Sequence, residues 1–267
     1  MNNSNLKSLK IFFAKKLRRY IKKDDCIYLE SDLTNFKNIF NKISNKKQFV
    51  EFFFEILQSL LGKNGTLICP SFSYSWGKSS KEKIFDINKT PGKTGIFSEF
   101  LRLKKKTIRT PDPMFSFIIF GKKKNFFSNT GNDSFGRKSV FEKMHQSNTK
   151  LISFGLNKFD PTFVHYVEQF FDENIKKINY RKKFKFKGIF KKKRNKTKKI
   201  HFSFMRPLNS KRIYSEKKIK YQLKKKKLIK SIVIHQGLIQ ITSCQSFFEE
   251  GIKGMTKDIN FFNKKIN

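Results

Sequence analysis

Residues 46–73 read KKQFVEFFFEILQSLLGKNGTLICPSFS, and they contain the pattern that decides the fold class. The first part repeats apolar residues at the three- and four-residue spacing of one helix face, which predicts a helix that ends at Gly62. The turn sequence Lys63-Asn64-Gly65 follows. The apolar residues TLICP at 66–70 are then typical of a short buried strand. A helix followed by a strand is the unit from which α/β proteins are built.

The same alternation continues on both sides of this unit. Upstream, a helical pattern over 6–23 precedes a strand over 26–30. Downstream, we predict loops over 71–94 and 126–138, helices over 94–103, 140–144, 162–171, 215–228 and 244–262, and strands over 116–120, 151–154 and, in two parts around Gly237, 231–242. We therefore expect an α/β fold in a single domain over residues 1–267, without internal repeats.

The segment 178–206 has a different pattern. Apolar and polar residues alternate in Phe184-Lys-Phe-Lys and again in Ile200-His-Phe-Ser-Phe, which is the period of a β-strand. Between them, residues 191–199 are almost entirely basic and polar. The sequence therefore predicts a β-hairpin excursion near the C-terminal third, with a charged tip at 191–199.

The composition is strongly basic. Lysine and arginine number 60 against 20 acidic residues, for a formal net charge of +40. Such a charge is typical of proteins that bind nucleic acids or anionic membranes. Lys, Asn, Phe and Ile are, however, enriched together in every segment, and these are the residues that AT-rich codons specify. We favour a genome-wide composition bias as the main cause, and we expect the basic surface to attract anionic ligands such as coenzyme phosphates.

The sequence contains few features that indicate a cellular compartment. Cys26, Cys69 and Cys244 are far apart and form no C-x-x-C spacing, so we expect buried free thiols rather than a zinc site or disulfides. The chain has no secretory signal pattern and no apolar run long enough to span a membrane, which favours the cytoplasm. The basic helix at 1–23 leaves two alternatives: a surface helix docked by its apolar face, which we favour, and a helix lying on an anionic membrane.

His165 and Glu168 are candidate catalytic residues. They are three residues apart in a predicted helix and therefore lie on one face. A carboxylate that orients an imidazole leaves the other ring nitrogen free to accept a proton. Acetyl transfer from a thioester to an amine needs such a base, because amines are largely protonated near neutral pH. The alternative is a structural pair on an ordinary helix.

Three loops contain further polar candidates. Thr94-Gly95 begins a predicted helix, where free backbone N–H groups can hold a phosphate or a pantetheine amide, although the spacing of a P-loop is absent. Asp112 lies between two prolines and can either hold a substrate ammonium or serve as a turn residue. Ser31-Asp32 and Ser71 follow strands and fit either ligand-binding loops or helix caps.

These motifs follow one another in a recognisable order. They are Ser31-Asp32-Leu33, Gly65 to Ser73, Phe85-Asp86, Thr90-Pro91, Thr94-Gly95, Glu99, Arg102, Arg109 to Ser116, Phe135-Gly136, Thr162 to Glu168, and Tyr180-Arg181. Single motifs are loose, but their order and spacing together are specific. The succession resembles the aminoglycoside 3-N-acetyltransferase family over about residues 20–260.

The resemblance implies an α/β/α layered fold, acetyl-CoA as co-substrate, and direct acetyl transfer to an amine. His165 matches the histidine of the family's Thr-x-x-His-x-x-Glu pattern, so the resemblance makes it the general base and Glu168 its orienting partner. Ser31, Ser71, Thr94 and Ser116 fall where the family lines its coenzyme and acceptor clefts. We expect Ser31, Asp32, Ser71, Thr94 and Gly95 to bind the coenzyme, and Asp112, Ser116 and Tyr180 to bind the acceptor.

One motif departs from the family pattern. Drug-modifying members usually read Arg-Ser-x-His-Pro-x-x-Ser where this chain has Arg109-Thr-Pro-Asp112-Pro-Met-Phe-Ser116. Asp112 cannot supply a neutral imidazole, so any role of that histidine is changed here. The aspartate form looks more like relatives associated with cell-surface polysaccharide synthesis. A protein with a charge of +40 also repels a polycationic drug, unless its pocket is acidic. We therefore favour a glycan-precursor amino sugar over an aminoglycoside as acceptor.

We expect a cytoplasmic N-acetyltransferase that uses acetyl-CoA and an amino sugar, without a metal, and that is linked to antibiotic resistance where the acceptor is an aminoglycoside. Two alternatives stay open. One is a basic nucleic-acid-binding protein, for which the basic segment 191–199 and the interleaved aromatic residues argue. The other is a catalytically inactive sugar-binding relative. The oligomeric state stays open as well.

Overall fold

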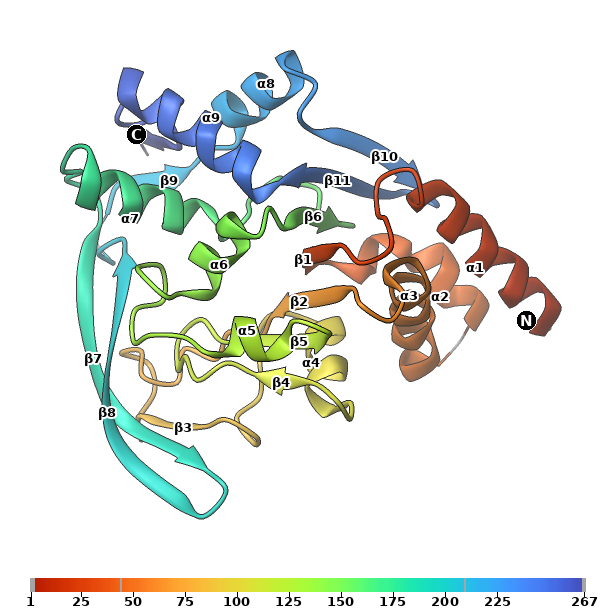
Figure 1. Cartoon of the computed structure of the whole chain (residues 1–267), viewed down its shortest axis with the longest axis horizontal. Helices are drawn as coiled ribbons and strands as arrows, with labels where there is room; N and C mark the ends of the chain where they lie inside the picture. The colour runs from red at the N-terminus through yellow and green to blue at the C-terminus, as the bar shows by residue number, and fades with distance from the viewer. Residues whose placement is uncertain (1–2, 44, 209, 266–267) are drawn as a thin grey trace.

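A mixed sheet forms the centre of the computed structural model, which describes residues 3–43, 45–208 and 210–265 (Figure 1). Within these residues the sheet has seven strands in the order β10-β11-β6-β1-β2-β5-β4. The three central strands are parallel to one another, and β11 and β5 flank them in antiparallel pairing. The strands are β1 (Cys26–Ser31), β2 (Thr66–Pro70), β4 (Ile108–Arg109), β5 (Phe117–Gly121), β6 (Lys150–Phe154), β10 (Lys230–Ile234) and β11 (Gly237–Ser243).

Helices cover both faces of the sheet and form two hydrophobic cores (Figure 1). The side chains of β1 alternate between them: Ile27 and Leu29 belong to one core, and Tyr28 to the other. The first core is covered by α1 (Asn3–Leu17), η1 (Leu33–Phe36), α2 (Lys37–Ile43), α3 (Lys46–Leu61) and α4 (Ile96–Leu103). The second is covered by α5 (Lys124–Ser128), α6 (Val140–Gln146), α7 (Val164–Asn174), α8 (Lys217–Lys225) and α9 (Cys244–Lys257). This is the predicted α/β/α arrangement.

The boundaries of α3 show how local sequence determines an element. The side chain of Asn45 accepts hydrogen bonds from the backbone N–H groups of Lys47 and Gln48, which caps the start of the helix. At the other end, Gly62 adopts a φ of +66°, a conformation that side chains disfavour. The helix predicted to stop at Gly62 is therefore confirmed, and β2 follows it at Thr66.

A long hairpin extends from the lower left of the molecule in Figure 1. It pairs β7 (Lys182–Lys192) with β8 (Asn195–Met205), and β3 (Ile84–Asp86) runs parallel to β7. The predicted tip at 191–199 is wrong in extent, because the turn is confined to Lys193-Arg194 and the flanking lysines are paired in the strands. The strands can contain so many lysines because most of these side chains extend into water. That the hairpin is an insertion into the family fold stays a prediction.

The middle of the hairpin packs against the loop that contains Trp76. At Gly188 an added Cβ would lie 2.5 Å from the Trp76 ring and 2.5 Å from the carbonyl oxygen of Lys83. No other residue fits there without a shift of its neighbours. The indole of Trp76 is 3% exposed, so the contact is fully enclosed.

Several short elements differ from the sequence predictions. The predicted loop at 71–94 contains β3, and α5 extends into the predicted loop at 126–138. The turn between β10 and β11 is formed by His235-Gln236, both with positive φ, rather than by Gly237. The predicted helix over 244–262 ends at Lys257, because the chain then turns back to form β12 (Asn263–Lys265), which pairs with β9 (Arg212–Tyr214).

Four further expectations concern the cysteines, the N-terminal helix, membrane-spanning segments and the number of domains. Cys26, Cys69 and Cys244 are buried and free, as predicted. α1 packs against α3: the ring of Phe13 contacts those of Phe52 and Phe53, and both Phe13 and Leu17 are fully buried. Among the described residues, no helix is both long and apolar enough to cross a membrane. The single domain over 1–267 stays a prediction.

Candidate active site

His165 and Glu168 face each other in the first turns of α7. The three-residue spacing brings both side chains to one face of the helix, as predicted. Nδ1 of His165 lies 3.6 Å from Oε2 of Glu168, which is longer than a hydrogen bond. The imidazole is 25% exposed, and Phe135 packs edge-on against it with the ring centroids 5.1 Å apart. Because Nδ1 faces the carboxylate, Nε2 lies on the opposite side of the ring.

Glu168 is completely buried and is held by residues from distant parts of the chain. Arg181 forms an ion pair with Oε2 through Nε, and Asn263 of β12 donates from Nδ2 to Oε1 at 3.2 Å. Arg206, just after β8, donates to Oδ1 of Asn263. That bond fixes which end of the Asn263 amide faces Glu168. Sequence reasoning missed Asn263 and Arg206, because only tertiary structure brings them to α7.

The surroundings keep His165 neutral and Glu168 ionised at neutral pH. Burial, followed by the positive charge of Arg181, lowers the pKa of His165 to about 4, although Glu168 acts in the opposite direction. Burial alone raises the pKa of Glu168, but Arg181, His165 and Arg206 outweigh it and bring the pKa to about 2. The unprotonated imidazole beside a fixed carboxylate can accept a proton from a substrate.

A second carboxyl group, that of Glu30 at the end of β1, lies beside the start of α7. It accepts hydrogen bonds from the Tyr28 hydroxyl and from the backbone N–H of Thr162, the latter at 2.9 Å. Burial raises the pKa of Glu30 to about 7, although these hydrogen bonds act to lower it. Sequence reasoning did not select Glu30. The signal that points to it is a charged residue at the end of an otherwise apolar strand.

Several predicted coenzyme-binding residues meet where β1 and β2 end and α4 begins. Gly95, with a φ of +100°, precedes α4, and an added Cβ there would lie 3.7 Å from the carbonyl oxygen of Ser31. Thr94 donates from Oγ1 to the carbonyl oxygen of Pro70 at 2.5 Å. Ser31 and Glu30 are neighbours in β1 and point to opposite faces of the sheet. Gly95, which lies beside Ser31, and the start of α7, which lies beside Glu30, therefore flank the end of the same strand.

Ser71, the first residue after β2, belongs to a buried polar network. Its carbonyl oxygen accepts hydrogen bonds from Ser116 Oγ at 2.6 Å and from Arg109 Nη2 at 2.8 Å. The Ser71 hydroxyl itself is buried without a hydrogen-bond partner among the described residues. An added Cβ on Gly92 would lie 2.6 Å from this hydroxyl. Ser71 is 0% exposed, and within the described chain the hydroxyls of Ser153 and Ser203 are buried without a partner in the same way.

Asp112 is bonded by its own loop and by the hairpin. Oδ1 accepts backbone hydrogen bonds from Met114 at 2.7 Å and Phe115 at 2.8 Å, and Oδ2 lies 3.2 Å from Nε2 of His201. Burial alone raises the pKa of Asp112, but His201 and the two backbone N–H groups bring it below its usual range. Both oxygens are thus in use within the protein, as in the turn alternative, and the predicted contact with a substrate ammonium stays a prediction.

Three other predicted site residues have partners within the protein. The Asp32 carboxylate caps η1 by accepting the backbone N–H of Thr34 at 3.0 Å. The Tyr180 hydroxyl donates to the carbonyl oxygen of Ile259 at 3.1 Å, and burial raises the pKa of this phenol. Ser116 is fully buried and uses its hydroxyl within the network around Ser71. Their contacts with coenzyme or acceptor stay predictions.

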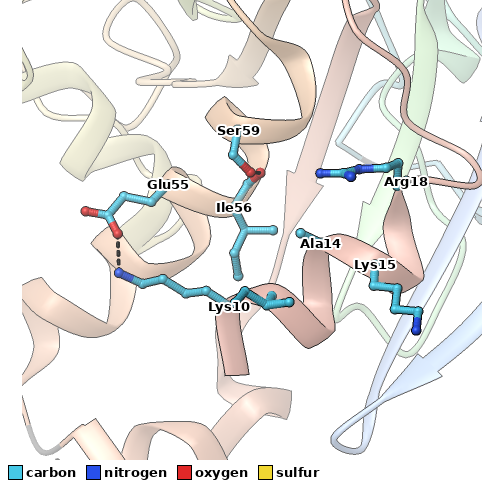
Figure 2. Close-up of a pocket in the computed structure, with 8 residues that line it drawn as sticks. Lys10, Ala14, Lys15, Arg18, Glu55, Ile56 and Ser59 are labelled. Carbon is cyan, nitrogen blue, oxygen red and sulfur yellow. Dashed lines mark hydrogen bonds and ion pairs between the residues drawn. The ribbon is translucent and has the colours of Figure 1, made fainter. Parts of the chain in front are cut away.

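A cavity of about 630 Å³ lies elsewhere, between α1 and α3 (Figure 2). Its walls contain Ala14 and Ile56, and the ion pair between Lys10 and Glu55 lies at one end. None of the predicted site residues lines it. Since α1 and α3 cover the face of the sheet opposite α7, this cavity is separate from the candidate active site.

The sequence profile of the aminoglycoside 3-N-acetyltransferase family matches residues 38–256. The chain belongs to this family. The match includes α4, Asp112 and the whole of α7 with His165 and Glu168, whereas Glu30 and Asn263 lie outside it. Family membership confirms the predicted acyltransferase class. No curated protein sequence gives a significant match.

Solved structures share the family fold. AAC-IIIb in a binary complex with CoASH superposes with a TM-score of 0.74 at 15% identity, covering 93% of this chain and 96% of that chain. YokD from Bacillus subtilis gives a TM-score of 0.72 at 16% identity, covering 93% and 99%. A variant of AAC(3)-IVa in complex with apramycin gives 0.71 at 14% identity, covering 94% and 93%. The predicted layered α/β fold is confirmed, and the CoASH complex of AAC-IIIb agrees with acetyl-CoA as the predicted co-substrate.

Proposed function

We propose that the protein transfers the acetyl group of acetyl-CoA to an amine of an amino sugar, with His165 as general base. The observation that carries the proposal is the neutral imidazole of His165 beside the fully buried, ionised carboxylate of Glu168. Family membership supports the transferase activity. The likeness to AAC-IIIb, which forms a binary complex with CoASH, supports the choice of donor.

The proposed reaction is a single direct transfer. Nε2 of His165 accepts a proton from the acceptor's amine while the amine nitrogen attacks the carbonyl carbon of the thioester. The new C–N bond forms, and the C–S bond breaks. The leaving thiolate of coenzyme A takes the proton from the imidazolium, which returns His165 to its neutral form. Glu168 stabilises the imidazolium and keeps Nδ1 on its own side of the ring.

The donor fits best at the cluster formed by Ser31, Ser71 and Gly95. The first backbone N–H groups of α4 have no partner within the helix and favour phosphate or amide oxygens. This cluster shares the end of β1 with the α7 residues, which would bring the thioester toward His165.

The acceptor we place first is an aminoglycoside. Structural relatives include AAC(3)-IVa variants in complex with apramycin and with a gentamicin, and AAC-VIa bound to sisomicin. The second candidate is a glycan-precursor amino sugar with an anionic group. Two observations favour it: the net charge of +40, and an aspartate at position 112 where the family usually has histidine.

Thiol release from acetyl-CoA tests the proposal, with aminoglycosides and nucleotide-linked amino sugars offered as acceptors. We expect acceptor-dependent release that His165→Ala lowers by about 10² or more. His235→Ala, on the β10–β11 turn outside the site, serves as the matched control and should keep the wild-type rate. The best acceptor decides between the two candidates. Absence of release with every acceptor, together with absence of acetyl-CoA binding by calorimetry, would overturn the transferase. Release that His165→Ala leaves unchanged would overturn the base.

A further inference from the structure

The outer side of α1 combines exposed apolar residues with exposed basic ones. Ile11 and Phe12 are 60% and 43% exposed, although their neighbour Phe13 is buried in the core. Four basic side chains on the next turns, those of Lys15, Lys16, Arg18 and Arg19, are also exposed. Within the described part of the chain none of these four forms an ion pair with a carboxylate. Their positive charges are therefore uncompensated.

The apolar surface continues from α1 onto the edge of the sheet. Phe12 contacts His235 of the β10–β11 turn, with the ring centroids 5.9 Å apart. On β10, the edge strand, Ile232 lines a hollow together with Phe12. Figure 1 shows this turn beside the C-terminal end of α1, at the right of the molecule. Ile11 and Phe12 thus present two large exposed apolar side chains beside the edge of the sheet.

Two hollows flank α1, and both combine an apolar floor with a basic rim. The cavity between α1 and α3 has Ile11, Ala14 and Ile56 in its walls and Lys15 and Arg18 at its edge (Figure 2). The second, of about 430 Å³, lies toward β10 and is lined by Phe12, Lys15, Lys16, Arg19, Tyr20 and Ile232. Apolar grooves next to uncompensated cations match the two parts of an anionic phospholipid, its acyl chains and its phosphate.

We propose that the α1 surface, defined by Ile11, Phe12, Lys15, Lys16 and Arg19, docks on anionic phospholipid membranes. Charge alone would equally suit a nucleic acid, but a nucleic acid leaves the exposed Ile11 and Phe12 without an apolar partner. A lipid surface covers both kinds of side chain at once. Because α1 and α7 cover opposite faces of the sheet, docking leaves the candidate active site uncovered.

Sedimentation of the full chain with vesicles tests this proposal. We expect binding to phosphatidylcholine vesicles that contain phosphatidylglycerol, and at least about tenfold weaker binding to phosphatidylcholine alone. Binding should weaken as salt is added, but a part should persist because apolar insertion is not screened. Binding to duplex DNA with higher affinity than to the anionic vesicles would overturn the proposal in favour of a nucleic-acid surface.

Two pairs of variants separate this surface from net charge. Ile11→Ser with Phe12→Ser should weaken vesicle binding by about tenfold or more, since each removes an apolar side chain of the inserting face. Leu208→Ser, which changes an 88% exposed residue in another loop, is the control and should have no effect. Lys15→Gln with Lys16→Gln should weaken binding far more than Lys196→Gln with Lys198→Gln on the hairpin, although both pairs remove the same charge. Equal losses from the two lysine pairs would overturn the assignment to α1.

Discussion

At the scale of single residues, the carboxyl groups of the site differ in ionisation because their partners differ. Glu168 is ionised, with a pKa of about 2, because Arg181 outweighs the effect of burial. Among the residues that the structure describes, Glu30 has no guanidinium beside it: Tyr28 and Thr162 contact it, and burial raises its pKa to about 7. Burial is common to both groups, and a neighbouring guanidinium decides which of them keeps its charge.

Glu30 should make the protein less stable as pH rises toward neutrality. In the unfolded chain its carboxyl group ionises near the ordinary value of 4.5, but in the folded protein the pKa is about 7, so ionisation favours the unfolded state between these values. Glu30→Gln cannot ionise and can still accept both hydrogen bonds. We expect the variant to lose less stability than wild type across this window, and to be more stable above it by on the order of 2 kcal/mol.

Urea unfolding as a function of pH measures this difference. The exposed Glu82→Gln serves as the control and should follow the wild-type curve. Parallel curves for wild type and Glu30→Gln would contradict the raised pKa of Glu30.

Sequence alone predicted the pair at the centre of the site but not the residues that support it. The spacing of His165 and Glu168 within one helix is a local property, so it can be read directly from the chain. Arg206 and Asn263 reach Glu168 only through β8 and β12, and no periodicity connects them to α7. Predicted site residues such as Asp32 and Tyr180 have partners that depend on turn geometry and burial, which a sequence pattern does not encode.

At the scale of secondary-structure elements, predictability follows length and periodicity. α3 and β2 were predicted with nearly correct ends, because the helix has a strong apolar face and both elements are bounded by turn residues. β3, β4, β9 and β12 are two or three residues long and were not predicted. Each is stabilised by a strand distant in sequence, or in β4 by β5, rather than by its own composition.

β12 has a role in the site that Asn263→Ala can test. The variant removes the hydrogen bond to Oε1 of Glu168, and a hydrogen bond to a charged group contributes roughly 1.5–3 kcal/mol. We expect kcat for acetyl transfer to fall about tenfold with little change in KM, because Glu168 orients the base rather than binding substrate. Lys264→Ala, at the next residue of the same strand, is the control. A fall in kcat of the same size in both variants would show that β12 acts only through folding.

The contact between the hairpin and the Trp76 loop sets a second prediction. Gly188→Ala places a Cβ 2.5 Å from the Trp76 ring and from the carbonyl oxygen of Lys83. Since both neighbours must move, we expect the free energy of unfolding to fall by about 1–3 kcal/mol. The exposed neighbour Lys187→Ala should change it by less than about 0.5 kcal/mol. Chemical denaturation compares the two, and equal stability of both variants would show that the junction is loosely packed.

At the scale of the whole molecule, the excess of positive charge affects the encounter with anionic substrates more than the fold. The two cores are built mainly from phenylalanine, isoleucine and leucine, and most of the lysines lie on the surface. A field of this sign attracts a ligand that carries phosphates, and dissolved salt screens it. The positive charge is therefore a property of the surface, and the family fold does not depend on it.

Salt should consequently change the KM for acetyl-CoA more than kcat. Raising the ionic strength from about 0.01 M to about 0.15 M shortens the screening length from ~30 Å to ~8 Å. We expect a severalfold rise in KM for acetyl-CoA over this range. Acetyl-pantetheine, which has the same thioester without phosphates, is the control and should show a flat response. A flat response for both donors would mean that the surface charge does not guide the coenzyme.

Because Trp76 packs against Gly188, tryptophan fluorescence can report on the state of the hairpin. The sequence contains one tryptophan, and its indole is buried where β7 meets the neighbouring loop. Tryptophan emission therefore comes from one known position in the fold. A red shift in emission would therefore mark water reaching the contact between β7 and the Trp76 loop, and a hairpin that detaches before the sheet unfolds would be visible by fluorescence without any added label.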